Sequence, residues 1–128
     1  MGDAIRVLIV DDAIFMRNML RDIFGGEEFE IVGEAANGVE AVEKFQALSP
    51  DLVTMDIVMP FKSGIDATRE ILQLDDKATI VMCSALGQES LVIEAIDAGA
   101  ADFIVKPFKP ADVQRVVRKA LTQGRAGA

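Results

Sequence analysis

The 128-residue chain contains no histidine, no tryptophan and no tyrosine, and it has a single cysteine. The lack of histidine excludes imidazole metal sites, Ser-His triads and a histidine that carries a phosphoryl group. The single cysteine, Cys83, lies in the apolar run Thr79–Cys83 and is expected to pack as a small buried hydrophobe rather than act in redox chemistry. Any phosphoryl or metal chemistry in this chain must therefore depend on carboxylates.

Positive charge is also scarce, because 13 Lys and Arg stand against 21 Asp and Glu, for a net charge of -8. This balance disfavours a nucleic-acid backbone or an anionic membrane as partner. No apolar run approaches the roughly 20 residues needed to span a bilayer, and Met1–Asp3 lacks the basic start of an export signal. With 51% apolar residues, the chain is expected to form one compact cytoplasmic domain that can bury a sizeable apolar core.

Short apolar runs alternate with segments in which apolar residues recur at helical spacing. Such alternation is typical of a doubly wound α/β domain, here a single domain with a five-stranded parallel sheet and helices on both faces. The domain is expected to span residues 1–121, and the Gly- and Ala-rich residues 122–128 to form a short flexible tail. The predicted strands are Ile5–Val10, Glu30–Ala35, Asp51–Asp56, Ala78–Cys83 and Asp102–Val105, and the predicted helices begin near Ala13, Val39, Ile65, Leu91 and Pro110.

Four of these strands run directly into polar side chains. Asp11 and Asp12 follow the first strand, Asp56 ends the third, Ser84 follows the fourth and Lys106 follows the fifth. The carboxyl ends of parallel strands meet at one edge of the sheet, where ligands bind at the point of reversed strand order. For the flavodoxin-like order 2-1-3-4-5, that point lies between the first and third strands. The sequence therefore predicts a pocket that gathers three acids, a hydroxyl and an ammonium.

Three carboxylates at one edge need a compensating cation, because two like charges 4 Å apart repel by about 4 kcal/mol at an effective dielectric of 20. Oxygen ligands without nearby His or Cys suit Mg²⁺. We expect Asp12 and Asp56 to bind the ion directly and Asp11 to act through water. Asp56 is the candidate nucleophile for a phosphoryl group, and Lys106 and Ser84 are expected to contact the phosphate oxygens.

Each of these residues, taken singly, has an ordinary structural alternative. Asp12 could cap the helix that follows it, Ser84 could be a loop residue, and Lys106 could be a surface lysine. Capping accounts for one acid and not for three at one edge, so the joint placement favours a binding site. For Phe103, packing in the core and a switching role both remain open.

The combination of Asp11-Asp12, the segment DLVTMDIVMP, Ser84-Ala85 and Lys106-Pro107-Phe108 resembles the receiver domains of two-component response regulators. The likeness covers nearly the whole chain, and the stretches CSALGQ and GAADFIVKPF are similar to the stand-alone chemotaxis regulators of that family. The resemblance implies the strand order 2-1-3-4-5 and a Mg²⁺-dependent transfer of a phosphoryl group from a kinase histidine to Asp56. It also implies slow self-catalysed hydrolysis, so the chain would be a signalling phosphoprotein of a phosphorelay rather than an enzyme.

The same resemblance implies further roles. The backbone carbonyl of Val58 would complete the Mg²⁺ ligands, and Ser84 and Phe103 would move together as a switch. The bond between Lys106 and Pro107 is a candidate cis bond, which the sequence leaves open. The switch would change the binding face formed by the last strand and the last two helices. The implied partners are a chemotaxis-type sensor histidine kinase and a downstream target such as the flagellar motor switch, with a monomeric chain and no nucleic acid or membrane.

Some positions depart from the common family pattern. Val58 and Leu86, each two residues past a site residue, are apolar where receivers often carry polar groups. These side chains flank the phosphate and control access of water, so the lifetime of the phosphorylated state is left open. Phe103 replaces a frequent tyrosine, and a signal that needs its hydroxyl is absent.

Other functions fit the sequence less well. A haloacid-dehalogenase-type phosphatase needs a second Asp as general acid, and Val58 occupies that position. A flavodoxin-like FMN carrier would meet repulsion from Asp11 and Asp12 and would lack a Trp or Tyr to stack on the flavin. A degenerate receiver that acts as a phosphorylation-independent scaffold, or a receiver that acts as a phosphate sink, is the more serious alternative.

Overall fold

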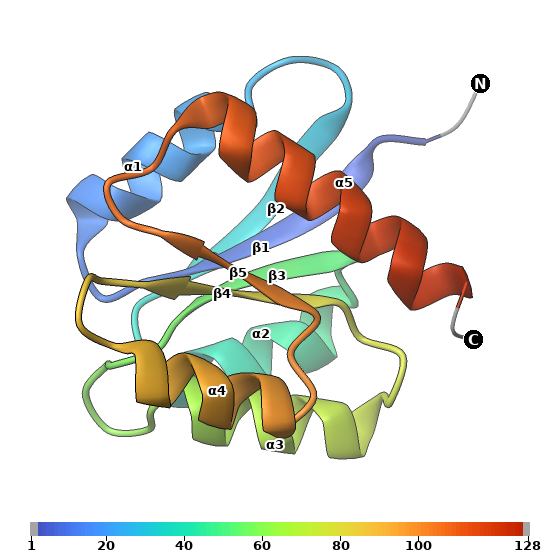
Figure 1. Ribbon diagram of the computed structural model, residues 1–128. Helices are drawn as coiled ribbons and strands as arrows, with labels where there is room; N and C mark the ends of the chain where they lie inside the picture. Colours follow the sequence, from blue (N-terminus) through green and yellow to red (C-terminus); the bar gives the residue numbers. More distant parts are fainter. Residues whose placement is uncertain (1–2, 127–128) are drawn as a thin grey trace.

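The computed structural model, which describes residues 3–126, has one five-stranded sheet with helices on both faces (Figure 1). The strands pair in parallel in the order β2-β1-β3-β4-β5, so the predicted fold class and strand order are confirmed. The strands are β1 (Ile5–Val10), β2 (Phe29–Ala35), β3 (Leu52–Asp56), β4 (Ile80–Ser84) and β5 (Asp102–Val105). The helices are α1 (Ile14–Ile23), α2 (Gly38–Leu48), α3 (Gly64–Leu74), α4 (Glu89–Asp97) and α5 (Pro110–Ala126).

A separate apolar core covers each face of the sheet. Successive side chains of a strand point to opposite faces, so Leu8 of β1 packs into the core under α2, α3 and α4, whereas Ile9 packs into the core under α1 and α5. Figure 1 shows this division, with α1 and α5 on one face and the other three helices on the opposite face. Because β1 and β3 are buried on both faces, the positions of their carboxyl ends are fixed by packing.

Side-chain caps define the starts of α2 and α3 but not of α1. Asn37 accepts a hydrogen bond from the backbone N–H of α2, and Ser63 does the same for α3. The N-cap of α1 is Ala13, which makes no side-chain cap bond, and its N–H donates instead to Oδ1 of Asp11 at 2.9 Å. Asp12 therefore does not cap α1, and the structural alternative considered for this residue is wrong.

The predicted helix starts and strand bounds agree with the structure to within two residues, but the last helix does not end where predicted. The helix α5 continues to Ala126, whereas the sequence pattern predicts an end at Leu121 and a flexible tail from residue 122. A single glycine costs a helix only about 1 kcal/mol, and Gln, Arg and Ala favour the helical conformation. The helix therefore continues through residues 122–126. Residues 127–128 of the predicted tail lie outside the described residues.

No helix within residues 3–126 combines the length and the apolar character that crossing a membrane requires.

Candidate functional site

Three acids meet at the carboxyl edge of the sheet, next to the point where the strand order reverses. Asp11 and Asp12 follow β1 and Asp56 ends β3, and one carboxylate oxygen from each lies within 4.8 Å of the other two. Asp11 is 1% exposed and Asp56 is 7% exposed, whereas Asp12 is open to solvent. Two acids thus form the floor of the site and the third stands at its rim. The structure brings together the acids that the sequence places there.

Lys106 supplies the positive charge of this site. Its Nζ atom donates to Oδ2 of Asp11 at 3.0 Å and to Oδ1 of Asp56 at 3.3 Å. The backbone N–H of Lys106 donates to the carbonyl of Ser84 at 2.8 Å, which ties the ends of β5 and β4 together. The bond from Lys106 to Pro107 is cis, as the family resemblance implies.

The electrostatics of the site are unfavourable for a negatively charged Asp56. Burial raises the pKa of Asp56 to about 6, and the neighbouring charge of Asp11 acts in the same direction, while Lys106 opposes both. Burial tends to lower the pKa of Lys106, but its hydrogen bond to Asp11 and the charge of Asp56 outweigh that effect, so the pKa of Lys106 is raised. A lysine that stays charged is thus fixed between two acids, and the site retains a net negative charge.

The remaining predicted residues lie around this pocket in different environments. Ser84 ends β4 and is 2% exposed, opposite Val105 in the sheet register. Val58 and Leu86 are 57% and 81% exposed in the loops that follow β3 and β4. Phe103 is 39% exposed, so it is not a buried core residue. The functional roles proposed for these four residues, including the ligand role of the Val58 carbonyl, remain predictions.

Gly64, at the start of α3, allows that helix to approach the end of β3. A Cβ atom at this position would lie 1.9 Å from the backbone oxygen of Asp56, far closer than any real contact. The N–H of Gly64 donates to the carbonyl of Ile57 at 2.8 Å. Only glycine fits between α3 and the end of β3, and this requirement was missed because it depends on a contact that the local sequence does not encode.

Arg17 on α1 was also missed. Its Nη1 atom donates to the main-chain carbonyl of Asp11 at 2.6 Å, and its Nε atom donates to Glu34 of β2 at 2.8 Å. The sequence shows only an acid in the second strand and a base on the first helix. Nothing in it indicates that Arg17 and Glu34 pair with each other. Arg17 therefore belongs to the surroundings of the acidic site.

The donor set of the site fits Mg²⁺. Three carboxylates converge without any sulfur or imidazole nitrogen, and hard oxygen ligands are those that Mg²⁺ prefers. Because Asp12 lies at the solvent-exposed rim, the site is open on that side. Water or a phosphate oxygen could there complete the coordination of a bound Mg²⁺ ion.

Comparison with known proteins identifies the class of protein that this fold and site define. Residues 7–118 match the family described as response regulator receiver domain, and the chain belongs to this family.

Its relatives include stand-alone members. The chain is 60% identical to the chemotaxis protein CheY of Thermotoga maritima over 114 residues, which cover 89% of this chain and 95% of that protein. It is 59% identical to the chemotaxis protein CheY of Bacillus subtilis, with 91% and 97% covered. Among solved structures, the CheX-CheY-BeF3-Mg²⁺ complex of Borrelia burgdorferi matches with a TM-score of 0.84 and 43% identity, covering 89% of this chain and 87% of that one. A CheY-like receiver domain protein of Methanospirillum hungatei, at 23% identity and a TM-score of 0.88, covers 98% of this chain and 99% of that one, and it shares the fold.

Proposed function

We propose that this chain is a chemotaxis response regulator whose Asp56 accepts a phosphoryl group from a sensor histidine kinase. The observation that carries the proposal is the convergence of three carboxylates and the Lys106 ammonium around Asp56. The chain contains no histidine, so the donor imidazole must come from a partner. This chain matches relatives named chemotaxis protein CheY over most of its length, which supports a role in chemotaxis.

Asp12 and Asp56 would hold Mg²⁺ directly, Asp11 would act through water, and the main-chain carbonyl of Val58 would be a further ligand. When bound, the ion would offset the repulsion between the carboxylate of Asp56 and an anionic phosphoryl group. The open rim at Asp12 supports this assignment because a coordinated phosphate oxygen needs a side of the site that faces solvent.

In the transfer step, a carboxylate oxygen of Asp56 attacks the phosphorus atom and the P–N bond to the donor imidazole breaks. The electron pair of that bond stays on the imidazole nitrogen. Lys106 pairs with a phosphoryl oxygen as a point charge, and the Ser84 hydroxyl donates a hydrogen bond to another. In hydrolysis, water attacks phosphorus and the P–O bond to Asp56 breaks. Inorganic phosphate leaves with the water oxygen and its protons, and the carboxylate is restored.

The phosphorylated form would signal through Ser84 and Phe103. A phosphoryl group brings about -1.5 to -2 charges, by analogy with other phosphorylated side chains. Phe103 borders two surface hollows, one with residues of α4 and one with residues of α5, so a movement of its ring would reshape the face that these elements share with β5. Shifting a 1:99 equilibrium to 99:1 requires about 5.5 kcal/mol of preference for the active state.

The proposed partners are a chemotaxis-type sensor histidine kinase and a downstream protein such as the flagellar motor switch, with the chain acting as a cytoplasmic monomer. The related CheY of Borrelia burgdorferi was solved with CheX, which supports a protein partner as the occupant of a receiver surface.

The test is the intact mass of the wild type and of Asp56→Asn after incubation with acetyl phosphate, each with and without Mg²⁺. Gain of one phosphoryl group only in the wild type, and only with Mg²⁺, is the expected result. No gain in the wild type, together with no structural shift on adding beryllofluoride and Mg²⁺, would overturn the proposal and favour the scaffold.

A further inference from the structure

Arg17 connects the acidic site to the neighbouring strand β2. Its side chain is 16% exposed and makes two directed contacts, one to the main-chain carbonyl of Asp11 at 2.6 Å and one to the carboxylate of Glu34 at 2.8 Å. A guanidinium presents several N–H donors in a rigid plane, so one arginine can satisfy both acceptors at once.

Glu34 is itself held from several directions. Arg21 of α1 also donates to its carboxylate, and Lys44 of α2 donates to its main-chain carbonyl. The next residue, Ala35, accepts a hydrogen bond at 3.0 Å from the backbone N–H of Asp11. The side chain of Glu34 is therefore held in place, and Arg17 links it to the backbone of Asp11.

The acid that needs such support is Asp12. The carboxylate of Asp11 is already fixed by the N–H of Ala13 and by Lys106. Within residues 3–126, by contrast, no hydrogen bond or ion pair holds the carboxylate of Asp12, which is exposed at the rim. Its direction depends on the peptide plane that joins it to Asp11, and the carbonyl oxygen of that plane is the acceptor of Arg17.

We propose that Arg17, braced by Glu34, is a positioning residue that aims Asp12 at the metal by fixing the peptide between Asp11 and Asp12. This inference rests on the proposed function, because it assigns a role toward the same Mg²⁺ site. Groups that orient metal ligands from outside the coordination sphere typically change metal affinity by 10- to 100-fold when removed.

The sign of the effect separates positioning from simple electrostatics. Arg17 carries a positive charge close to the site, so its removal makes the site more negative and, by charge alone, tightens Mg²⁺ binding. A positioning role predicts weaker binding. Arg17→Lys sharpens the contrast, because it keeps the charge but offers a single nitrogen that cannot reach both acceptors in the same geometry.

The experiment titrates Mg²⁺ into the wild type, Arg17→Ala, Arg17→Lys and Arg118→Ala, with NMR amide shifts as the readout. The expected result is about 10-fold weaker Mg²⁺ binding in both Arg17 variants. Arg118→Ala is the control for the loss of one arginine, because Arg118 of α5 pairs with Glu28 at the surface and makes no contact with Asp11 or Glu34. It is expected to bind Mg²⁺ as the wild type does. Melting curves without Mg²⁺ establish that each variant is folded.

A second readout uses phosphorylation by acetyl phosphate at a series of Mg²⁺ concentrations. The Mg²⁺ concentration for half-maximal rate should rise in the Arg17 variants, while the rate at saturating Mg²⁺ stays within about twofold of the wild type. Unchanged or tighter Mg²⁺ binding in Arg17→Ala, or wild-type binding in Arg17→Lys, would overturn the inference. A wild type that binds Mg²⁺ but gains no phosphoryl group would overturn the proposed function alone, since the Mg²⁺ titration still decides the role of Arg17.

Discussion

The ammonium of Lys106 lies 3.3 Å from Oδ1 of Asp56, although the two residues are 50 positions apart in the chain. Lys106 follows the edge strand β5 and reaches past β4 to the end of β3. The same nitrogen lies 3.0 Å from Asp11, so one cation partly neutralises two buried acids. The charge balance at this edge of the sheet therefore depends on one side chain, which in the proposed function also contacts the phosphoryl group.

Replacing Lys106 with methionine should destabilise the protein at neutral pH. The carboxylates of Asp11 and Asp56 would then lie close together without a counter-charge. Removing one partner of a fully buried ion pair costs about 3 to 5 kcal/mol. The Lys106 side chain is 21% exposed, which lowers the expected loss in free energy of unfolding to about 1 to 3 kcal/mol. Urea unfolding at pH 7.5 without Mg²⁺ measures it.

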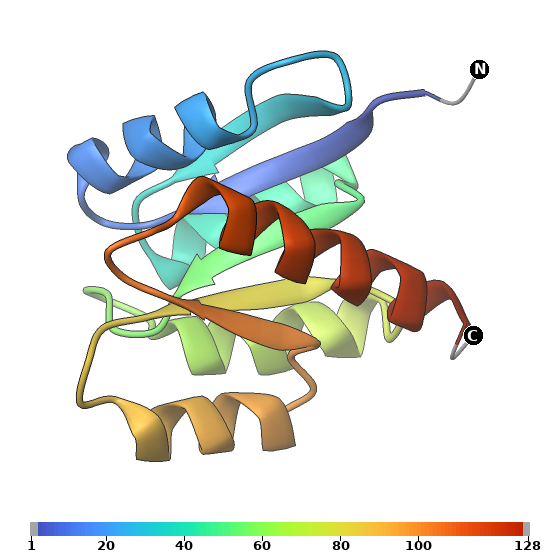
Figure 2. The same ribbon diagram turned by 45° about the horizontal axis from the view of Figure 1, so that its top comes forward.

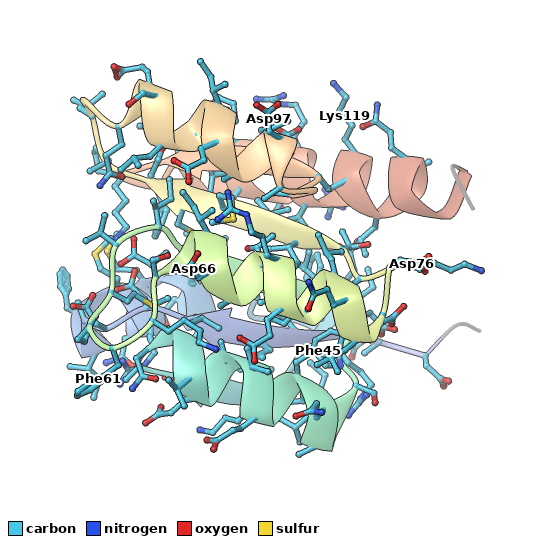
Figure 3. All side chains as sticks on the ribbon, turned by 90° about the horizontal axis from the view of Figure 1, so that it is seen from below. Phe45, Phe61, Asp66, Asp76, Asp97 and Lys119 are labelled. Carbon is cyan, nitrogen blue, oxygen red and sulfur yellow. The ribbon has the colours of Figure 1, made fainter. Side chains whose placement is uncertain are left out.

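Lys119→Met is the matched control, because Lys119 is an exposed residue of α5 that Figure 3 shows on the outside of that helix. It should change the unfolding free energy by less than about 0.5 kcal/mol. A Lys106→Met protein as stable as the control would contradict the prediction.

Asp56→Asn should stabilise the protein when no Mg²⁺ is present. Burial and the charge of Asp11 raise the pKa of Asp56 to about 6, from an ordinary value of 3.8. The folded state thus holds the proton of Asp56 more tightly than the unfolded state. Protonated Asp56 therefore contributes to the free energy of unfolding. This contribution is fully present below pH 3.8 and is lost as the pH rises through about 6. Asparagine cannot ionise, so the variant should be more stable than the wild type by about 1 to 3 kcal/mol at pH 7.5.

The measurement is urea unfolding at pH 4.0, 5.5 and 7.5 with EDTA present. The advantage of Asp56→Asn should vanish near pH 4, where the wild-type acid is protonated, and shrink when Mg²⁺ stabilises the wild type at pH 7.5. Asp66→Asn, a change at an exposed acid of α3 labelled in Figure 3, controls for the loss of one negative charge. An advantage independent of pH would show that ionisation of Asp56 is not its cause.

Gly64→Ala should disrupt the carboxyl end of β3. The new Cβ would lie 1.9 Å from the backbone oxygen of Asp56, and the obstacle is backbone rather than a flexible side chain. We expect a loss of about 2 kcal/mol or more in unfolding free energy and slower phosphorylation by acetyl phosphate. Asp66→Ala in the same turn of α3 provides the comparison, because its exposed ion pair with Arg69 contributes little. Wild-type melting of Gly64→Ala would contradict the prediction.

The sheet and the acids of the site could be predicted because both depend on short-range patterns. Apolar runs mark buried strands, and a polar residue directly after each run marks the shared edge. The position of Phe61 illustrates the limit of such patterns. It projects from the loop between β3 and α3, is 89% exposed and has a φ of 70°, and Figure 3 places it at the end of the molecule opposite Asp76. No local rule predicts a phenylalanine in that conformation.

The contacts that support the site could not be predicted, because they join distant segments. Arg17 and Glu34 are ordinary charged residues of a helix and a strand until the fold places α1 beside the end of β2. The reader can follow this arrangement in Figure 2, where the face with α1 and α5 is turned toward the viewer. Gly64 likewise looks like any glycine between a loop and a helix. The need for glycine there arises only when α3 packs against Asp56. Supporting contacts of this kind arise from tertiary packing alone.

Thr54→Val should stabilise the protein. Thr54 is fully buried in β3 between Ile9 and Val81, and its hydroxyl has no hydrogen-bond partner among the described residues. An unsatisfied buried hydroxyl costs about 1 to 3 kcal/mol, and valine has nearly the same shape. We expect a gain of about 1 kcal/mol, measured as a rise in Tm.

Thr68→Val is the matched control for that gain. Thr68 is also fully buried, but its hydroxyl lies 3.6 Å from the sulfur of Met82 and donates to it. The same substitution therefore removes a weak hydrogen bond at Thr68 and none at Thr54. Equal effects at the two positions would show that apolar burial alone, and not the unpaired hydroxyl, determines the change.

Val58→Asn should shorten the lifetime of the phosphorylated state. Val58 is 57% exposed in the loop directly after β3, and its apolar side chain could not hold a water molecule beside a phosphoryl group on Asp56. An amide at this position can donate to and accept from the attacking water, which favours its orientation toward phosphorus. We expect dephosphorylation to be severalfold faster. The measurement is the loss of the phosphorylated species by intact mass, over time after acetyl phosphate is removed. Val39→Asn, at an exposed position of α2, should decay at the wild-type rate. If Val58→Asn also decayed at that rate, access of water to Asp56 would be controlled by other side chains, of which Leu86 is the next to replace.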